Sequence, residues 1–522
     1  MLLRVATWLT GFAAIALASE RSLWREAPAA RTVPQLSVSV ATEAPIAVVD
    51  EKYLSVAVDM ANVVGGAFWD PSKNAGPMGT AKVAPYDFAR PRLRKLAAAL
   101  APAFLRVGGT DADRTAYELA PANNSGSTAA QWKLSTNQWR NLNAFAQDVG
   151  FRVMFTLNAG QSARNNQGAW DPQSARALVE DATAHQYPVD VWEFGNELNV
   201  YPVLHQQWLS PRSYSDDLQK VRWLLGEASP KTRLAGPAVA FWPHIGEGLP
   251  FLNSFMQAGG DLVDVVTWHY YPQQSFRCPA ATNRAKSGQV LRPQELAEVD
   301  RWAKYVEETK LKHNSRAELW LGETGSAQCG GEPELSDRFA SSLWWVDQLG
   351  RLARRGQKVV IRQTLSGGDY GLIDEASLTP NPDYWASLLW RQNMGTSVLD
   401  ASVNVSDAPV QAYAHCLRGS ASGGIAIALV NGHPSQTTTV SLPQYKGTAG
   451  LFVVKAANPQ SRTITINGVE PRLSAQGDVP QLLPTELSFA PGEASRLPLP
   501  PLSYAFVLFP QAAIAACTTK LN

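Results

Sequence analysis

The sequence has almost no net charge, because 46 Lys and Arg residues balance 45 Asp and Glu residues over 522 positions. A protein dedicated to nucleic acid normally carries a basic face and a basic overall charge, so we expect no nucleic-acid partner. The balance does not exclude a local basic cleft for an anionic ligand, because the walls of a cleft focus the electrostatic field whatever the total charge.

Long hydrophobic runs are also scarce, and the one that is present lies at the start of the chain. Arg4 is followed by an apolar run from Val5 to Ala18 that ends in the small-x-small pattern Ala16-Leu17-Ala18. This run is too short for a bilayer anchor and is typical of a secretory signal peptide. We assign residues 1–18 to a signal peptide and the charged, Pro- and Ala-rich residues 19–34 to a linker. The mature protein is expected to be secreted or periplasmic, without a membrane anchor.

The sequence contains only four cysteines, Cys278, Cys329, Cys416 and Cys517. Their spacing matches no zinc motif, so we expect no metal. Export permits disulfides, and four cysteines allow three pairings. We favour a bond between Cys416 and Cys517, because both lie in the strand-rich C-terminal region. Cys278 and Cys329 would then either join two loops or remain free buried thiols.

A Gly-rich phosphate-binding loop is missing after the first predicted strand, which disfavours a nucleotide-binding open sheet. From about residue 50 to residue 395, short apolar runs alternate about eight times with amphipathic helical patterns such as Thr136–Val149. The pattern predicts an α/β fold, a (β/α)8 TIM barrel over residues 50–395, with its active site at the C-terminal ends of the strands. The predicted strands are Tyr53–Asp59, Phe104–Gly109, Arg152–Asn158, Val189–Glu197, Thr232–Ala238, Val263–Tyr271, Ala317–Thr324 and Val359–Leu365.

The pattern changes after residue 395. Short alternating segments are separated there by clusters of Gly, Pro, Asn and Ser, which indicates an antiparallel β-sandwich. Residues 35–49 contain a similar segment ahead of the barrel. We expect residues 35–49 and 396–522 to form one C-terminal β-sandwich domain.

Two glutamates end predicted strands on opposite sides of the barrel. Glu197 follows the fourth strand in Gly195-Asn196-Glu197, and Glu323 ends the seventh in Leu321-Gly322-Glu323. Hydrolysis of a glycosidic bond with retention needs one protonated and one ionised carboxyl group about 5 Å apart. The pair therefore predicts a retaining glycoside hydrolase, with Glu197 as proton donor and Glu323 as nucleophile.

A lone glutamate after a strand is more often a helix cap or a solvated residue. Two glutamates at these strand ends, in an exported barrel, favour catalysis instead. Glu193 lies within the fourth strand and is not a rival candidate. It alternates toward the barrel interior, where a charge needs a partner such as Arg106.

Four polar residues near these strand ends are candidates for contacts with the substrate or the nucleophile, and two of them also have a structural interpretation. The Asn196 amide is well placed to bond the 2-hydroxyl of a sugar. His269 and Tyr271 end the sixth strand, where either can donate to the nucleophile, although a histidine at the barrel rim is as often structural. Asp59, which ends the first strand, can accept from sugar hydroxyls or cap a helix.

With these residues aligned, the chain resembles the heparanase family of glycoside hydrolases, family 79, over nearly its whole mature length. The densest match runs from Leu319 to Leu399 and includes Trp320-Leu321-Gly322-Glu323-Thr324, Arg362-Gln363 and Pro382-Asp383-Tyr384-Trp385. Leu105-Arg106-Val107-Gly108-Gly109-Thr110 matches as well. The heparanases of this family are endo-β-glucuronidases that act on heparan sulfate.

The resemblance implies the same roles for Glu197, as acid/base, and for Glu323, as nucleophile. It also implies that Cys416 and Cys517 are paired. A pocket for the carboxylate of a uronic acid is implied at Asp59, Tyr271, Gly330, Gln363 and Tyr370.

The chain departs from the family pattern in three ways. Gln328-Cys329 stands where animal heparanases have a tyrosine before the glycine run, and Cys329 takes a glycine position. The long excisable linker of animal proenzymes is missing, so the chain resembles the single-chain bacterial members. Basic residues for sulfate are few, and those present are either sulfate ligands or ordinary solvated side chains: Arg164, Arg277, Arg284, Lys286 and Arg362.

Three functional hypotheses follow. The leading one is a monomeric, cofactor-free, retaining endo-β-D-glucuronidase that cuts glucuronosyl-glucosamine linkages in heparan sulfate-type polysaccharides, so the expected partner is an anionic polysaccharide. The second is an exo-acting β-glucuronidase of the same family. The third, a catalytically silent carbohydrate-binding protein, predicts replacement of at least one glutamate, and both are present.

Overall fold

The structure is a computed structural model that describes residues 36–69, 79–119, 130–405, 408–445, 447–489 and 495–518. The predicted signal peptide, residues 1–18, and the predicted linker, residues 19–34, lie outside these ranges. Within them, no helix is both long enough and apolar enough to cross a bilayer.

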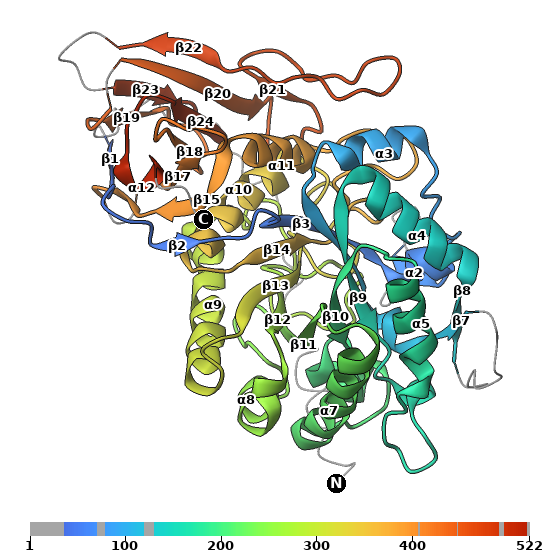
Figure 1. The fold of residues 1–522 in the computed structure, drawn as a ribbon. Coiled ribbons are helices and arrows are strands. Elements are labelled where there is room, and N and C mark those ends of the chain that lie inside the picture. Colours follow the sequence, from blue (N-terminus) through green and yellow to red (C-terminus); the bar gives the residue numbers. More distant parts are fainter. Residues whose placement is uncertain are drawn as a thin grey trace, which may run out of the picture. The chain divides into compact units, whose positions relative to one another are not determined.

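Eight parallel strands close into a barrel, which confirms the predicted fold (Figure 1). The ends of the fourth, fifth and eighth strands each differ from the prediction by three residues, and the fourth strand shows the reason. It was expected to reach Glu197 but ends at Phe194, because Gly195 and Glu197 adopt left-handed backbone conformations that no strand continues through. In barrel order the strands are β3 (Leu54–Asp59), β6 (Ala103–Gly108), β9 (Phe151–Leu157), β10 (Val189–Phe194), β11 (Arg233–Phe241), β12 (Val265–Tyr270), β13 (Glu318–Thr324) and β14 (Val359–Arg362).

Helices surround the barrel strands (Figure 1). The helix over Thr136–Val149 has the bounds that the sequence predicts, because Ser135 and Gln138 form a capping box at its start and Gly150 ends it at a φ of 77°. The main helices are α3 (Pro91–Ala98), α4 (Thr136–Val149), α5 (Gln173–Ala184), α7 (Pro211–Ala228), α8 (Leu252–Gly259), α9 (Pro293–His313), α10 (Phe339–Arg354) and α11 (Pro382–Asn393).

The barrel interior is a packed apolar core rather than a channel. Side chains from all eight strands form one cluster, in which the ring centroids of Phe104 and Trp320 lie 4.7 Å apart. Polar side chains at the C-terminal strand ends therefore lie above a closed floor, where the loops can enclose a ligand. The cluster contains Ala57, Phe104, Met154, Val191, Ala235, Val265, Trp320, Val359 and Ile361.

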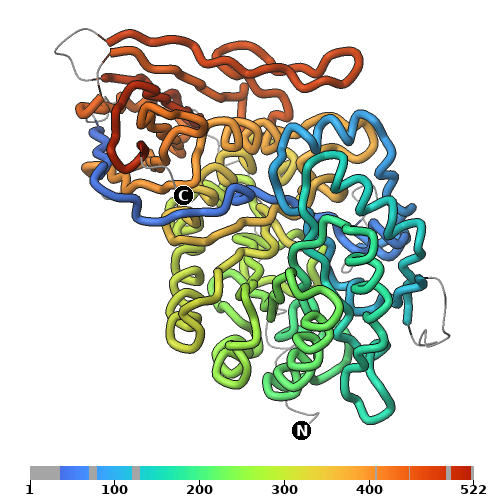
Figure 2. Tube along the Cα trace, viewed as in Figure 1, coloured from blue at the N-terminus to red at the C-terminus, as the bar shows by residue number. Residues whose placement is uncertain are grey.

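The C-terminal strands form two sheets, of four and eight strands, around a second apolar core, which confirms the predicted β-sandwich. The first described strand, β1 (Leu36–Val40), pairs with β16 and β19 and so lies among strands from the far end of the chain (Figure 2). The other strands of these two sheets are β2 (Ala47–Val48), β15 (Met394–Leu399), β16 (Ala401–Val403), β17 (Val410–Leu417), β18 (Ile425–Asn431), β19 (Thr438–Leu442), β20 (Thr448–Ala456), β21 (Ile464–Ile466), β22 (Thr485–Ser488), β23 (Ser495–Leu499) and β24 (Ser503–Phe509). Two smaller sheets pair β4 (Ala67–Trp69) with β5 (Thr80–Lys82) and β7 (Thr115–Glu118) with β8 (Trp132–Ser135).

Both disulfides are formed, Cys416 with Cys517 and Cys278 with Cys329. The favoured pairing of Cys416 and Cys517 is therefore present, and it joins β17 to α12 (Ala515–Thr518). For the domain boundaries we propose the division that the sequence suggests: a barrel over residues 50–395, and a sandwich of residues 35–49 and 396–522.

Helix α10 packs against β17 through a buried polar contact. Tyr413 of β17 donates its hydroxyl to Asp347 Oδ1 at 2.5 Å, and Arg351 Nε donates to Asp347 Oδ2 at 2.6 Å. The Tyr413 ring covers Gly350, where an added Cβ would lie 2.1 Å from a ring carbon. The ring is buried and cannot move aside without breaking this contact, so the position requires glycine.

We predict that Gly350→Ala destabilises the protein by about 1–3 kcal/mol through overpacking. Gly226→Ala is the matched control, since Gly226 is exposed on α7 and an added Cβ would meet nothing within 4 Å. That change should stabilise the protein by about 0.5–1 kcal/mol through helix propensity. Urea unfolding measures both, and a gain in stability for Gly350→Ala would contradict the packing described.

Candidate active site

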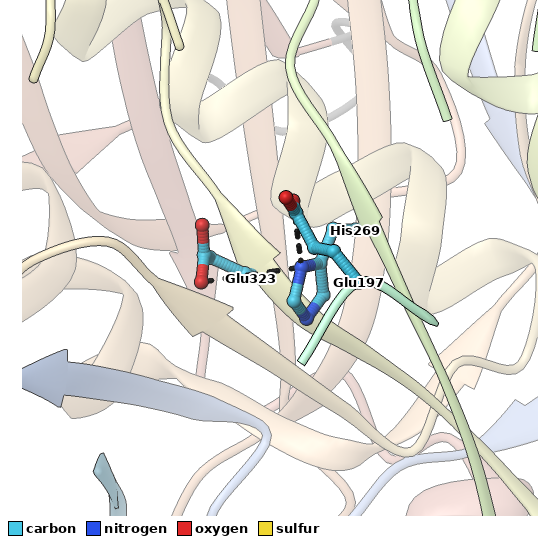
Figure 3. Close-up of side chains that lie close together, drawn as sticks. All are labelled: Glu197, His269 and Glu323. Carbon is cyan, nitrogen blue, oxygen red and sulfur yellow. Dashed lines mark hydrogen bonds and ion pairs between the residues drawn. The ribbon is translucent and has the colours of Figure 1, made fainter. Parts of the chain in front are cut away.

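Three side chains meet at the C-terminal ends of the barrel strands: Glu197, His269 and Glu323 (Figure 3). One carboxylate oxygen of each glutamate and a ring nitrogen of the histidine all lie within 4.8 Å of one another. His269 Nδ1 is 3.2 Å from Glu197 Oε1 and 4.0 Å from Glu323 Oε2. Each glutamate is 8% exposed, so both are buried but not fully closed off from solvent. The structure thus brings the two predicted glutamates together.

The backbone after β10 sets the direction of Glu197. Gly195 and Glu197 have φ angles of 72° and 55°, and the Glu197 N–H donates to the Ala238 carbonyl at 2.9 Å. A left-handed conformation is uncommon for a residue with a side chain and concentrates at functional sites. The turn therefore holds Glu197 in one orientation, at a local cost in stability.

Glu323 is fixed by two donors. The Tyr271 hydroxyl donates to Oε1 at 2.7 Å, and Arg106 Nη1 donates to Oε2 at 2.8 Å. Burial raises the pKa of Glu323, but the neighbouring His269 and Arg106 and the Tyr271 hydrogen bond outweigh it, so the pKa lies below its ordinary value. Glu323 is therefore ionised at neutral pH, the state in which a carboxylate can attack carbon.

The Arg106 guanidinium is fully buried and connects Glu323 to the barrel interior. Its Nε donates to Glu193 Oε2 at 2.9 Å, so the suggested partnership of Glu193 with Arg106 is present. Its Nη2 donates to Asn196 Oδ1 at 2.9 Å, and the Gly109 N–H donates to the same oxygen at 3.2 Å. These donors fix the Asn196 amide with its oxygen toward Arg106.

The residues expected to bind a uronate lie beside Glu323. Gln363 Nε2 is 3.3 Å from Asp59 Oδ2 and 3.5 Å from the Tyr370 hydroxyl. The rings of Tyr370 and Tyr271 stack with centroids 6.5 Å apart, and Tyr271 contacts Glu323 directly. The structure therefore brings four of the five predicted pocket residues into one group.

Asp59 has both of the roles considered for it. It caps α2 (Met60–Val64) by accepting from the Ala61 N–H at 3.0 Å, and its other oxygen faces Gln363. Burial raises the pKa of Asp59 to about 8, against the Ala61 hydrogen bond and with a contribution from the charge of Glu323. At neutral pH the Asp59 carboxyl is therefore mostly protonated and can act as a hydrogen-bond donor.

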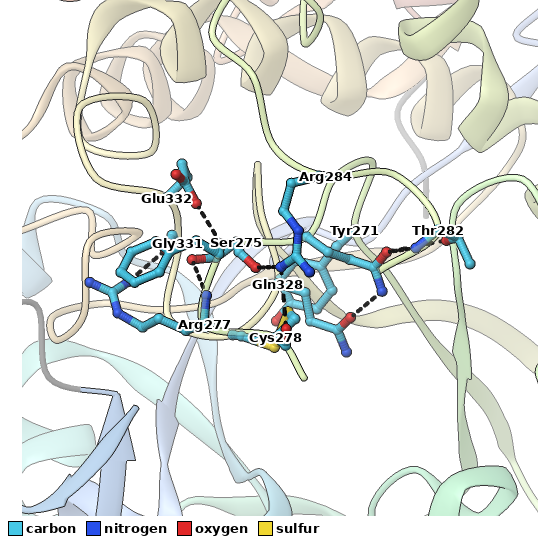
Figure 4. Close-up of a disulfide and its surroundings, with 12 residues drawn as sticks. Tyr271, Ser275, Arg277, Cys278, Thr282, Arg284, Gln328, Gly331 and Glu332 are labelled. Atoms are coloured by element: carbon cyan, nitrogen blue, oxygen red, sulfur yellow. Dashed lines mark hydrogen bonds between the residues drawn. A yellow bond between two sulfur atoms is a disulfide. The ribbon is translucent and has the colours of Figure 1, made fainter. Parts of the chain in front are cut away.

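Gly330, the fifth pocket residue, lies against Trp69, where an added Cβ would be 2.3 Å from the Trp69 Cβ. Trp69 in turn packs on the cluster that contains Tyr271 and Tyr370. The residue before it, Cys329, is bonded to Cys278 and has a φ of 63° (Figure 4). This left-handed backbone agrees with the glycine that the family pattern has at this position.

The predicted sulfate ligands are largely engaged within the protein. Arg164, Arg277 and Arg362 are at most 2% exposed at the side chain, and each forms an ion pair of 2.7 Å with a carboxylate of the protein. These three arginines are therefore neither solvated side chains nor free to bind a sulfate group. Arg284 is exposed but donates to the carbonyls of Ser275 and Cys278, and Lys286 also has an intramolecular partner.

Ligand atoms of Glu197, His269 and Glu323 are close enough together to hold a metal ion. Both oxygens of Glu323, however, already accept hydrogen bonds, and the buried charge of Arg106 opposes a cation there. Hydrolysis by a carboxyl pair needs no metal. The donor set therefore fits a pair of carboxyl groups better than a metal centre.

Residues 35–350, more than half of the chain, match the family described as “Glycosyl hydrolase family 79, N-terminal domain”. The chain belongs to glycosyl hydrolase family 79. It is therefore a glycoside hydrolase, as the sequence predicts. Heparanase-like protein 1 from Arabidopsis thaliana is 30% identical over 85% of this chain and 88% of its own length. Heparanase from Bos taurus is 30% identical over 82% and 85%, and baicalin-beta-D-glucuronidase from Scutellaria baicalensis is 27% identical over 90% and 91%.

A solved structure also has this fold. The 4-O-alpha-L-rhamnosyl-beta-D-glucuronidase from Fusarium oxysporum superimposes with a TM-score of 0.62 over 91% of this chain and all of its own. The sequence identity is 15%, so the likeness concerns the fold alone.

Two supporting residues of the site were not predicted from the sequence. Arg106 was suggested only as a partner of Glu193, although its place two residues after Phe104 on a fully buried strand points it into the same interior as Glu323. Asp113 accepts the Asn196 N–H at 2.9 Å. No local pattern identifies Asp113, because the two residues are 83 positions apart.

We predict that Arg106→Met destabilises the protein by about 3–5 kcal/mol, because Glu193 and Glu323 lose their buried counter-ion. Without Arg106, which lowers the pKa of Glu323, the folded-state pKa of Glu323 rises, so the folded protein binds more protons than the unfolded one. The loss in stability should therefore be larger at pH 7.5 than at pH 5 in urea unfolding.

Arg152→Met is the control for this change. Arg152 lies on the neighbouring strand β9 and pairs with Asp190, with 42% and 31% of the two side chains exposed. An exposed pair contributes at most about 1 kcal/mol. Equal effects of the two substitutions would contradict the central place given to Arg106.

Proposed function

We propose that the protein is a retaining β-D-glucuronidase that cuts glucuronosyl-glucosamine linkages within heparan sulfate-type chains. The observation that carries this proposal is the approach of Glu197 and Glu323, whose oxygens come within 4.8 Å of each other. Retaining glycosidases hold their two carboxyl groups about 5 Å apart, whereas inverting enzymes separate them by about 6.5–9.5 Å to admit a water.

In the proposed reaction Glu323 attacks the anomeric carbon while Glu197 protonates the leaving glycosidic oxygen. A glycosyl–Glu323 ester results and the leaving sugar departs with its new hydroxyl. Glu197, now ionised, removes a proton from water, which attacks the anomeric carbon and releases Glu323. The lowered pKa of Glu323 supports its role as nucleophile. The fixed amide of Asn196 supports a hydrogen bond from its NH₂ group to the sugar 2-hydroxyl.

For the uronate carboxylate we propose the pocket of Asp59, Tyr271, Gly330, Gln363 and Tyr370. Its donors are neutral: the Tyr370 hydroxyl, the Gln363 NH₂, the Gly330 N–H and the protonated Asp59 carboxyl, while the Tyr271 hydroxyl donates to Glu323. Because Asp59 is mostly protonated at neutral pH, it does not repel the anionic sugar. The relatives named heparanase and baicalin-beta-D-glucuronidase support a glucuronide substrate.

Endo action is proposed because heparanases are among the relatives that cover most of this chain. An exo-acting β-glucuronidase is the second candidate, and the similarity to baicalin-beta-D-glucuronidase over 90% of the chain favours it. Export to a secreted or periplasmic location is also proposed, supported by two disulfides, which persist in oxidising compartments. We propose a monomer as the working form.

The proposal predicts that the enzyme shortens heparan sulfate by internal cuts and that each new reducing end first appears as the β-anomer. Size-exclusion chromatography and proton NMR of the fresh products measure the two properties. Release of single uronic acid units alone would identify the exo enzyme, and an initial α-anomer would exclude retention.

Glu323→Gln is the matched control for this experiment. It should lower turnover by at least about 10⁴-fold while polymer binding is kept, because the isosteric amide keeps the shape of the site but cannot attack carbon. Its oxygen can still accept from Arg106, and its NH₂ can donate to the Tyr271 oxygen. Normal turnover in Glu323→Gln would remove Glu323 as the nucleophile.

A second prediction concerns pH. Asp59 is protonated below its pKa of about 8 and ionised above it. As the pH rises past this value, the KM for an aryl β-glucuronide should increase by on the order of tenfold, since two carboxylates then share the pocket.

In Asp59→Asn, which keeps a helix-capping side chain and cannot ionise, this increase should be missing. The KM for an aryl β-glucoside should show no such increase in either protein. A KM for the glucuronide that rises equally in both proteins would show that another group is responsible.

A further inference from the structure

Three loops that carry residues of the proposed uronate pocket are joined to one another. The loop after β12 and the loop after β13 are linked by the Cys278–Cys329 disulfide. They also pair through their backbones: the Gln328 N–H donates to Gln273 O at 2.9 Å, and the Ser275 N–H donates to Gln328 O at 3.2 Å. Cys329 is directly followed by Gly330, so the bond is anchored one residue from the pocket.

The third loop, after β14, is attached through Arg277. Its guanidinium forks between two loops: Nη1 donates to Gly331 O at 2.8 Å, and Nη2 donates to Asp369 Oδ2 at 2.7 Å. The Asp369 N–H closes the connection by donating to Gly330 O at 2.7 Å. Asp369 directly precedes Tyr370, so Arg277 ties the two pocket positions Gly330 and Tyr370 to one rigid group.

These loops need cross-links to stay in one conformation, because their glycines allow the backbone several conformations. Gly330, Gly331 and Gly368 have φ angles of 85°, 84° and 61°, which glycine reaches with little preference over other conformations. The contacts between these loops are also close, since a Cβ at Gly331 would lie 2.7 Å from the Tyr370 nitrogen. Small shifts in either loop would therefore change how the Gly330 N–H and the Tyr370 hydroxyl converge.

We propose that Arg277, together with the Cys278–Cys329 disulfide, is a positioning device that determines specificity for the uronate carboxylate. It does not touch the substrate. It fixes the Gly330 N–H and the Tyr370 hydroxyl at the separation that a carboxylate requires, so that the ordering of these loops is complete before the substrate binds. This inference rests on the proposed function, because it assumes that the pocket binds a uronate.

The test compares an aryl β-glucuronide with the corresponding aryl β-glucoside, which has a hydroxymethyl group in place of the carboxylate. In Arg277→Lys, one ammonium nitrogen replaces the two nitrogens of the planar guanidinium, so Gly331 O and Asp369 Oδ2 are no longer both held in their present positions. The KM for the glucuronide should rise by about 10- to 100-fold, the usual effect of a small displacement in a binding site. The kcat/KM for the glucoside should stay within about twofold, since loss of carboxylate binding leaves it unaffected.

A second variant tests the same inference without disturbing the ion pair between Arg277 and Asp369. Cys278→Ser/Cys329→Ser leaves Arg277 and Asp369 paired and removes only the covalent link, and it should lower the glucuronide-to-glucoside preference in the same direction. The matched control is Cys416→Ser/Cys517→Ser, which removes the other disulfide, located in the sandwich. Its preference should equal that of the wild type, even where its thermal stability falls.

Two outcomes would overturn the inference: an unchanged preference in both the Arg277→Lys and the Cys278→Ser/Cys329→Ser proteins, or an equal loss of activity toward both substrates in them. A failure of the proposed function is distinguishable, because the wild type itself would then show no preference for the glucuronide.

Discussion

The site depends on one buried positive charge, that of Arg106, placed between Glu193 and Glu323. A carboxylate that is 8% exposed would ordinarily take up a proton, because burial disfavours the charged form. His269, Arg106 and the Tyr271 hydroxyl reverse this for Glu323 and lower its pKa. The arginine in turn cannot be buried without carboxylates around it, so Glu193 completes its charge balance from inside the barrel. The ionisation of Glu323 is thus a property of the barrel interior as well as of the pocket.

The same guanidinium also shapes the opposite side of the site. By holding the oxygen of Asn196, it fixes the residue directly before Glu197, and the left-handed backbone of Glu197 then directs that side chain toward Glu323. One buried group therefore constrains the two carboxyls, which come from strands on opposite sides of the barrel. A (β/α)8 barrel allows this because its strand ends converge above a packed core.

The sequence predicted the features that depend on local patterns. Near-continuous apolar runs identified all eight barrel strands, and the capping residues of Thr136–Val149 set that helix to its observed bounds. Glu197 and Glu323 were identified because strand order alone places the ends of the fourth and seventh strands across one barrel mouth. The contacts of Arg277 could not be predicted in this way. Its partners Gly331 and Asp369 are 54 and 92 residues away, and their pairing depends on three loops whose conformations come from glycines rather than from periodicity.

The pairing of buried arginines with carboxylates of the protein limits how an anionic sugar can be recognised at this site. Arg106, Arg277 and Arg362 are all buried and all paired with carboxylates of the protein. The proposed pocket must therefore attract a carboxylate with neutral donors, which lose strength steeply when their distance or angle departs from the optimum. A lysine would tolerate such displacement, because its charge acts over a longer range and its side chain is flexible. Neutral donors gain selectivity only when the backbone that carries them is rigid. The Cys278–Cys329 disulfide and the two hydrogen bonds of the Arg277 guanidinium can supply this rigidity.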